Sequence, residues 1–286
     1  MSNQITTAFV QQYSSNVQML AQQMGSRLRE AVDVETITGK NAYFDQVGVT
    51  AAQVRTSRHA STPQVDTPHS RRRVSLADYE WADLIDDADK VQLLIDPTSS
   101  YAKAAAAAMG RSIDDVIIAS ALGTAYTGKS GSTSTSFASG NKIVHGSAGL
   151  TLAKLISAKK ILDEGDVDPS IQRYIAVAPE QMEDLLNLST VTSADYNTVR
   201  ALVQGDIDTY VGFKFIQSNR LTTDSDGNRQ VFAFTEDAVK LAIGKDVTAR
   251  VDERSDKSYS TQVYYCMSIG ATRMQEASIV EIACTE

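Results

Sequence analysis

The feature that most constrains this fold is a long helix, which the sequence predicts over residues 97–122. Pro97 suits a first helical turn, the hydroxyl residues after it can cap the helix, and alanine fills positions 104–108. Gly123 is a natural C-terminal stop. At about 1.5 Å per residue the helix is a rod of about 39 Å. Gly110 costs about 1 kcal/mol relative to alanine in a helix, and we interpret it as a bend.

The rest of the chain mixes helices and strands, so the sequence predicts the α+β class. Strands are predicted over 173–178, 246–253, 261–272 and 278–284, and helices over 151–164 and 179–187. A hairpin is predicted over 211–235 around the turn DSDGN. Shorter helices are predicted at 92–96, 199–203 and 235–244.

Residues 8–32 have one apolar stripe at spacings of three and four, which predicts an amphipathic helix. Its apolar positions are Val10, Tyr13, Val17, Leu20, Met24 and Leu28. Two interpretations stay open: the helix packs on its own domain, or it is an arm that docks on another subunit.

A basic segment is followed directly by an acidic one. Residues 39–73 lack sustained periodicity and have a charge balance of +4, whereas residues 74–96 have a balance of −6. Either these are two solvated faces that never meet, or the first is an extended hairpin whose basic tip lies on the acidic surface of a neighbour.

Residues 123–130 read GTAYTGKS, which fits the phosphate-binding loop pattern of nucleotide hydrolases. That loop requires a strand before it and a helix that begins near its lysine. Here a long helix precedes Gly123, and the Ser/Thr/Gly-rich stretch after Lys129 is among the least helical in the chain. We therefore interpret the string as a helix end and a loop.

The sequence also gives little support for a metal site or for a catalytic site of another kind. DSDGN places Arg229 and Thr235 where a calcium loop needs glycine and glutamate, so a turn is predicted. The three histidines lie in loop segments without metal-ligand spacing, and there is no G-x-S-x-G elbow. Cys266 and Cys284 lie on apolar strands and are predicted to be buried free thiols. We expect no enzyme, no cofactor and no metal.

The net charge and the lack of targeting signals limit the kinds of partner that we expect. The formal net charge is −8, so any contact with DNA is expected to be weak and nonspecific. No run of 18 apolar residues and no signal peptide is present, which predicts no membrane partner and a protein made in a cytoplasm.

Three stretches resemble the major capsid protein of a tailed bacteriophage, with the Hong Kong 97-type fold. DDADKVQLLIDPTSSYAKAAAAAMGRSIDDVIIASALG is similar to the segment that runs into the family's spine helix, including the paired acids Asp114 and Asp115. RYIAVAPEQMEDLLNLSTVTSADYNTVRALVQGDIDTYVGFKFIQSNRL is similar to the axial domain, and YYCMSIGATRMQEASIVEIAC resembles the closing peripheral strands. The order of these parts covers nearly the whole chain.

The resemblance implies five parts. Residues 1–38 would be an N-terminal arm, 39–80 an extended loop, 81–149 the peripheral domain with the spine helix, 150–235 the axial domain and 236–286 the closing strands of the peripheral domain. It implies a subunit that assembles with itself into hexamers and pentamers of an icosahedral shell around double-stranded DNA, in the host cytoplasm and then in the virion capsid.

The resemblance also suggests partners. A separate scaffold protein is expected because there is no room before residue 39 for a fused one, together with a portal and a cement or decoration protein. Some members link their subunits through a Lys–Asn isopeptide bond, but residues 41–73 contain no lysine, so non-covalent locking is expected. Our own hypothesis pairs basic loop residues of one subunit with acids of another, through Arg55, Arg58, Arg71, Arg72, Arg73, Asp83, Asp86 and Asp87.

Two alternatives remain. The same fold serves in encapsulins, the shells of bacterial cargo compartments, which would call for a cargo protein that carries a docking peptide. The other is a nucleotide hydrolase that uses Lys129 and Ser130.

Overall fold

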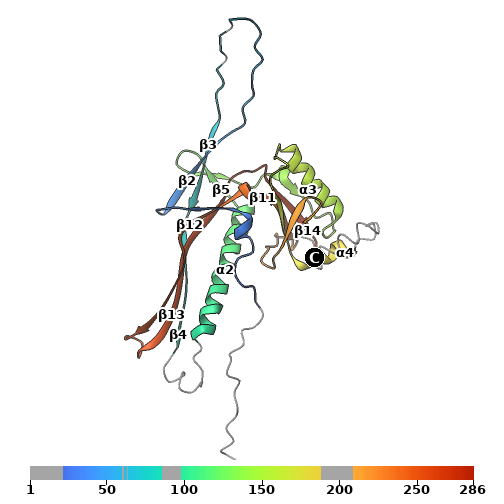
Figure 1. Cartoon of the computed structure of the whole chain (residues 1–286). Helices are drawn as coiled ribbons and strands as arrows, with labels where there is room; N and C mark the ends of the chain where they lie inside the picture. The colour runs from blue at the N-terminus through green and yellow to red at the C-terminus, as the bar shows by residue number, and fades with distance from the viewer. Residues whose placement is uncertain (1–21, 60, 63, 86–97, 188–208) are drawn as a thin grey trace, which may run out of the picture.

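The computed structural model describes residues 22–59, 61–62, 64–85, 98–187 and 209–286. Figure 1 shows an elongated molecule in which helix α2 runs beside a long, narrow sheet. A loop projects far from one end, and a second unit that contains α3 and α4 lies to one side. The described strands form three sheets.

Helix α2 (Thr98–Leu122) confirms the predicted long helix. Gly123 ends it, and the Gly123 backbone N–H donates to the Ala119 carbonyl at 2.9 Å. The helix packs against β13 of the long sheet. Its buried hydrophobic side chains are alanine, methionine and isoleucine, namely Ala105, Ala107, Met109, Ile113, Ile117, Ile118 and Ala121.

The long sheet has the order β1 (Asp33–Thr36), β12 (Val239–Arg254), β13 (Ser260–Arg273) and β4 (Ala77–Ile85). It contains the strands predicted over 246–253 and 261–272. The helix predicted over 235–244 is wrong, because only a 3-10 turn, η4 (Glu236–Ala238), precedes β12. Residues 240–243 instead pair with β1 on one side and β13 on the other, and this non-local pairing overrides the local preference.

The second unit is a six-stranded sheet with the order β7 (Lys142–Ile143), β14 (Ile279–Cys284), β11 (Arg229–Thr235), β8 (Arg173–Val177), β10 (Phe213–Gln217) and β9 (Thr209–Tyr210). Helices α3 (Leu152–Glu164) and α4 (Pro179–Asn187) confirm two predicted helices. Thr151 caps α3 by accepting the Lys154 backbone N–H. The core of the sheet is aromatic and aliphatic, with Phe213, Phe232 and Phe234 fully buried.

The hairpin predicted over 211–235 is wrong, although both of its strands exist. Strand β8 lies between β10 and β11; it is parallel to β10 and antiparallel to β11. DSDGN does form the predicted turn, because the Asp224 carboxylate accepts the backbone N–H groups of Asp226 and Asn228. The chain therefore turns back at DSDGN but returns one strand further along the sheet.

A third sheet joins the projecting loop to the end of α2. Its order is β2 (Asn41–Val47), β3 (His69–Ser75), β5 (Ala125–Thr127) and β6 (Thr133–Thr135). Strands β2 and β3 are antiparallel, so residues 39–73 contain the extended hairpin that was one of the two interpretations of the basic segment. A short 3-10 turn, η3 (Ser139–Asn141), precedes β7.

The helix predicted over 8–32 is not present in its described part. Residues 22–28 are irregular and are followed by a 3-10 turn, η2 (Arg29–Ala31), and then by β1. Residues 8–21 and the short helices predicted at 92–96 and 199–203 lie outside the described residues.

Candidate subunit-contact surfaces

The β2–β3 hairpin carries its connecting loop, residues 48–68, away from the rest of the subunit (Figure 1). The described side chains of this loop are exposed, and Val49 at 94% and Val54 at 89% are almost fully so. Arg55 and Arg58 are exposed on the same loop, and the Arg55 side chain donates to the nearby Ser57 carbonyl at 2.9 Å. Among the described residues of the subunit, none buries a side chain of this loop.

The three consecutive arginines at the base of the hairpin have different environments, because successive residues of a strand face opposite sides. Arg71 lies opposite Asp45 in the β2–β3 ladder and holds it in a bidentate ion pair, with Nε–Oδ1 at 2.5 Å. This hydrogen bond lowers the pKa of Asp45. Arg73 stacks on the ring of Tyr126, 4.8 Å from its centroid.

Arg72 faces the interior and is only 8% exposed. Its guanidinium donates to the Met274 carbonyl at 3.1 Å and lies 3.4 Å from the Glu276 carboxylate. Burial lowers the pKa of Arg72. Of the basic residues that the sequence suggested for contacts with a neighbour, Arg72 is therefore the one whose side chain is buried within its own subunit.

The acidic candidates are only partly described. Asp83 lies on β4, opposite Val263 of β13, and is partly exposed. Asp86 and Asp87 lie outside the described residues. No described contact joins Asp83 to the arginines of the hairpin within one subunit.

A clamp between the N-terminal segment and α2 was missed by sequence reasoning. Asp114 on α2 is 0% exposed, and its carboxylate accepts hydrogen bonds from the side chains of Gln23 and Ser26, each at 2.5 Å. It also accepts the backbone N–H groups of Arg27 and Leu28 at 3.1 Å. An acid at a buried helix position was the available signal, because a buried carboxylate requires such partners.

Gly110, interpreted above as a bend, has a different role. A Cβ atom at Gly110 would lie 2.4 Å from the carbonyl carbon of Gly25. The glycine therefore allows the N-terminal segment to cross α2 at backbone contact, one turn before Asp114.

Arg273 anchors the other end of α2. It is fully buried, and its Nη1 donates to the carbonyls of Ala121 at 3.0 Å and Gly123 at 2.6 Å. These carbonyls belong to the helix C-terminus, where the helix dipole favours a cation. The last turn of α2 is thereby fixed to β13 of the long sheet.

The string GTAYTGKS has the wrong context for phosphate binding, as predicted. Gly123 follows α2, β5 follows directly, and Gly131 closes a turn by donating to the Gly128 carbonyl at 2.9 Å. Strand β6 then begins at Thr133, so no helix begins at Lys129. The strand–loop–helix order that a nucleotide site requires is absent from this stretch.

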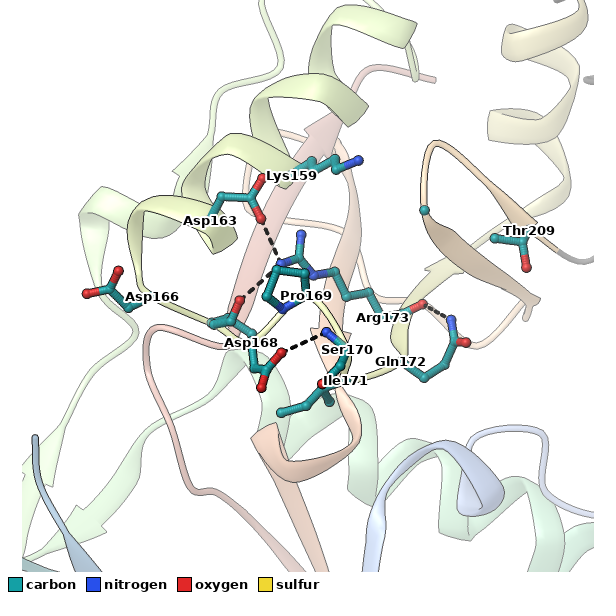
Figure 2. Close-up of a pocket in the computed structure, with 12 residues that line it drawn as sticks. Lys159, Asp163, Asp166, Asp168, Pro169, Ser170, Ile171, Gln172, Arg173 and Thr209 are labelled. Atoms are coloured by element: carbon teal, nitrogen blue, oxygen red, sulfur yellow. Dashed lines mark hydrogen bonds and ion pairs between the residues drawn. The ribbon is translucent and has the colours of Figure 1, made fainter.

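A polar pocket of about 580 Å³ lies beside α3 and the loop after it (Figure 2). Two of its carboxylates are engaged: Asp163 forms an ion pair with Arg173 at 2.7 Å, and Asp168 accepts the Ser170 backbone N–H at 2.8 Å. The latter bond lowers the pKa of Asp168. A general acid or base at neutral pH needs the opposite shift, so Asp168 is poorly suited to that role.

Other predicted features can now be placed. Cys284 is buried, but Cys266 is partly exposed, so the prediction of two buried thiols is wrong for Cys266; both cysteines are free. Within the described ranges, no cluster of three or more His, Cys, Asp or Glu residues could hold a metal ion. None of the described helices is long and apolar enough to cross a membrane.

Comparison with solved structures gives the fold. The chain is similar to the capsid of cyanophage P-SCSP1u, at 19% identity and a TM-score of 0.74, covering 99% of this chain and 94% of that one. It is also similar to the capsid of cyanophage Pam1, at 14% identity and a TM-score of 0.73, covering 98% and 97%. A structure from Mycobacterium phage Che8 matches at 18% identity and a TM-score of 0.68, covering 96% and 97%. These likenesses confirm the expected Hong Kong 97-type fold over nearly the whole chain.

The sequence comparisons agree with the fold. No curated protein is similar enough to this sequence to count as a match. A family model described as phage capsid protein matches residues 5–286. The chain therefore belongs to the phage capsid protein family.

Proposed function

We propose that this chain is the self-assembling major subunit of a tailed-phage shell, forming hexamers and pentamers of an icosahedral capsid around double-stranded DNA. The family match over residues 5–286 carries the proposal, since it makes the chain a structural protein of the virion capsid and not an enzyme. The likeness to several phage capsid chains at full length supports it.

The exposed loop of residues 48–68 also supports self-assembly. Loops longer than about 12–15 residues without regular structure are uncommon in compact domains, and they are often functional. Here the apolar side chains Val49 and Val54 are exposed, and covering them with another molecule would be favourable because it removes apolar surface from water. A loop that lies over the adjacent subunit would bury them.

The division into parts is proposed on the same basis. Residues 1–38 would be the N-terminal arm, 39–80 the extended loop, 81–149 and 236–286 the peripheral domain, and 150–235 the axial domain. Strand β14 falls in the last peripheral range but pairs with β11 of the six-stranded sheet, so the two domains share this strand at their boundary.

Contacts between subunits are proposed to pair the basic hairpin with acids of a neighbour. The residues proposed on the basic side are Arg55, Arg58, Arg71 and Arg73, and those on the acidic side are Asp83, Asp86 and Asp87. Arg72 is left out because its side chain is buried within its own subunit. We also propose a separate scaffold protein, a portal and a cement protein as partners, and non-covalent locking of the shell.

Electron microscopy of the purified full chain, with and without a candidate scaffold, tests the proposal. Closed icosahedral particles, or rings of five and six, are expected. Particles that contain a cargo protein in place of DNA would favour the encapsulin alternative. A uniform small globule under all conditions, together with nucleotide binding that Lys129→Ala abolishes, would contradict the proposal.

A further inference from the structure

A second polar pocket lies where four distant segments meet. Residues 22–27 of the N-terminal segment, α2, the start of α4 and the end of β10 with the loop after it surround a volume of about 660 Å³. None of the residues proposed above for contacts between subunits lines this pocket.

The lining of this pocket is unusual for a chain with a net charge of −8. Among its described residues are three arginines and four side-chain amides, but no carboxylate: Gln22, Gln23, Arg27, Arg111, Pro179, Gln217, Asn219 and Arg220. The pocket of Figure 2, by contrast, is lined by three aspartates. The second pocket therefore concentrates positive charge.

The arginines of the pocket are held in place by hydrogen bonds and one ion pair. Arg220 forms a bidentate ion pair with Asp115 of α2, with Nε–Oδ1 at 2.8 Å. Arg111 donates to the Gln22 side chain at 2.8 Å and to the Gln23 carbonyl at 3.3 Å. Arg27 donates to the Gln217 carbonyl at 2.6 Å. These bonds fix three guanidinium groups that come from three different segments.

Two of the three cations are not neutralised. Within the described part of the chain, no ion pair involves Arg27 or Arg111, whose guanidinium groups donate to neutral oxygens. Two cations that line one pocket without ion-pair partners of their own repel each other, which costs free energy. In addition, α4 begins at Pro179, so the positive end of its dipole adds to the same side. An anion would offset this cost.

We propose that this pocket binds a phosphate group through Arg27, Arg111 and Arg220. A guanidinium presents a planar fork of donors that matches phosphate oxygens, and several forks can share one phosphate because it offers several oxygens. A single carboxylate offers two oxygens and satisfies one fork. The phosphate can belong to a DNA backbone or to a free anion, and the DNA source rests on the proposed function, because a capsid encloses DNA.

The test uses the full chain and two probes. Binding of a fluorescent duplex of about 20 base pairs is measured by anisotropy over a range of salt, since phosphate contacts make duplex binding depend on salt. Inorganic phosphate is titrated at constant ionic strength while the melting temperature is recorded. The variants are Arg27→Gln, Arg111→Gln and the triple variant with Arg220→Gln. The control is Arg250→Gln, which removes one exposed arginine of β12 outside the pocket and outside the contacts proposed above.

We expect each single variant to weaken phosphate or duplex binding about tenfold. The salt dependence of duplex binding should fall by about one unit of slope for each arginine that is replaced. The control keeps the pocket intact and so keeps the phosphate response. Circular dichroism checks that the variants fold, because Arg220→Gln also removes the ion pair with Asp115. If the triple variant unfolds, Arg111→Gln alone decides the result.

The probes separate the two sources. If inorganic phosphate shifts the melting temperature but duplex binding does not depend on the arginines, the site binds a free anion. If binding of both probes depends on the arginines, the site also binds the phosphates of DNA. The inference is overturned if neither probe responds to Arg27→Gln or Arg111→Gln, or if only acidic peptides bind. Particle formation in the electron microscope is a separate readout, so failure of this site leaves the shell proposal unaffected.

Discussion

At the scale of single residues, Asp114 connects the N-terminal segment to the spine helix α2. We predict that Asp114→Asn lowers the free energy of unfolding by about 2–4 kcal/mol, since an amide nitrogen would face N–H donors and leave buried donors unsatisfied. Urea denaturation measures this, and trypsin should cleave faster after Arg27. Asp115→Asn is the matched control, because its ion pair with Arg220 is exposed and worth about 1 kcal/mol or less. Equal losses in both variants would contradict the clamp.

The two cysteines should differ in reactivity. A hydrogen bond from Lys245, with Nζ–Sγ at 2.9 Å, lowers the pKa of Cys266, whereas burial raises the pKa of Cys284 to about 12. We predict that iodoacetamide modifies Cys266 in the folded protein and Cys284 only after unfolding, because the thiolate is the reactive form. Lys245→Met should raise the pKa of Cys266, so that its alkylation rate at neutral pH falls several-fold and recovers at higher pH. Mass spectrometry identifies the modified cysteine, and an unchanged rate profile would rule out the role of Lys245.

At the scale of elements, the helices that could be predicted from the sequence are those whose ends are marked by nearby residues. The helices at 98–122, 152–164 and 179–187 have caps, a proline start or a glycine stop beside them, and all three are present. Two of the predictions that were wrong concern strands whose pairing depends on residues distant in the sequence. Nothing near DSDGN indicates that β8 inserts between β10 and β11. Residues 240–243 become a strand because β1 and β13 pair with them. The alternation along β3 places Arg72 inside and Arg71 outside, which a strand assignment there would have predicted.

The crossing of the N-terminal segment over α2 can be tested at Gly110. Alanine has the higher helix propensity by about 1 kcal/mol, yet its Cβ would meet the Gly25 backbone. We predict that Gly110→Ala destabilises the protein by about 1–3 kcal/mol, since overpacking against backbone outweighs propensity. Thermal unfolding measures the effect. Gly140→Ala is the control, as nothing lies within 4 Å of its added Cβ; a stabilised Gly110→Ala variant would show that the close approach is not maintained.

At the scale of the whole molecule, the shape separates folding from assembly. The buried core joins α2, the long sheet and the six-stranded sheet, whereas the described residues of the 48–68 loop contribute nothing buried to it (Figure 1). Substitutions on the loop should therefore change contacts with other subunits while the subunit stays folded. Arg72 and Arg55 are both arginines of the same hairpin, but only Arg72 belongs to the folded interior.

This separation gives a sharp prediction for charge reversal. Arg55→Glu with Arg58→Glu should leave the melting temperature nearly unchanged, because both side chains are exposed, but should reduce particle formation in the electron microscope at physiological salt. Arg72→Glu should instead unfold the subunit, since it would place a second carboxylate beside Glu276 in the interior. If the loop arginines face Asp83 of a neighbour, Asp83→Lys should restore particles to the double variant, and high salt should weaken wild-type assembly as charges are screened. Normal assembly of the double variant would contradict charge pairing by the loop, and recovery with Asp83→Lys would identify the acid it meets.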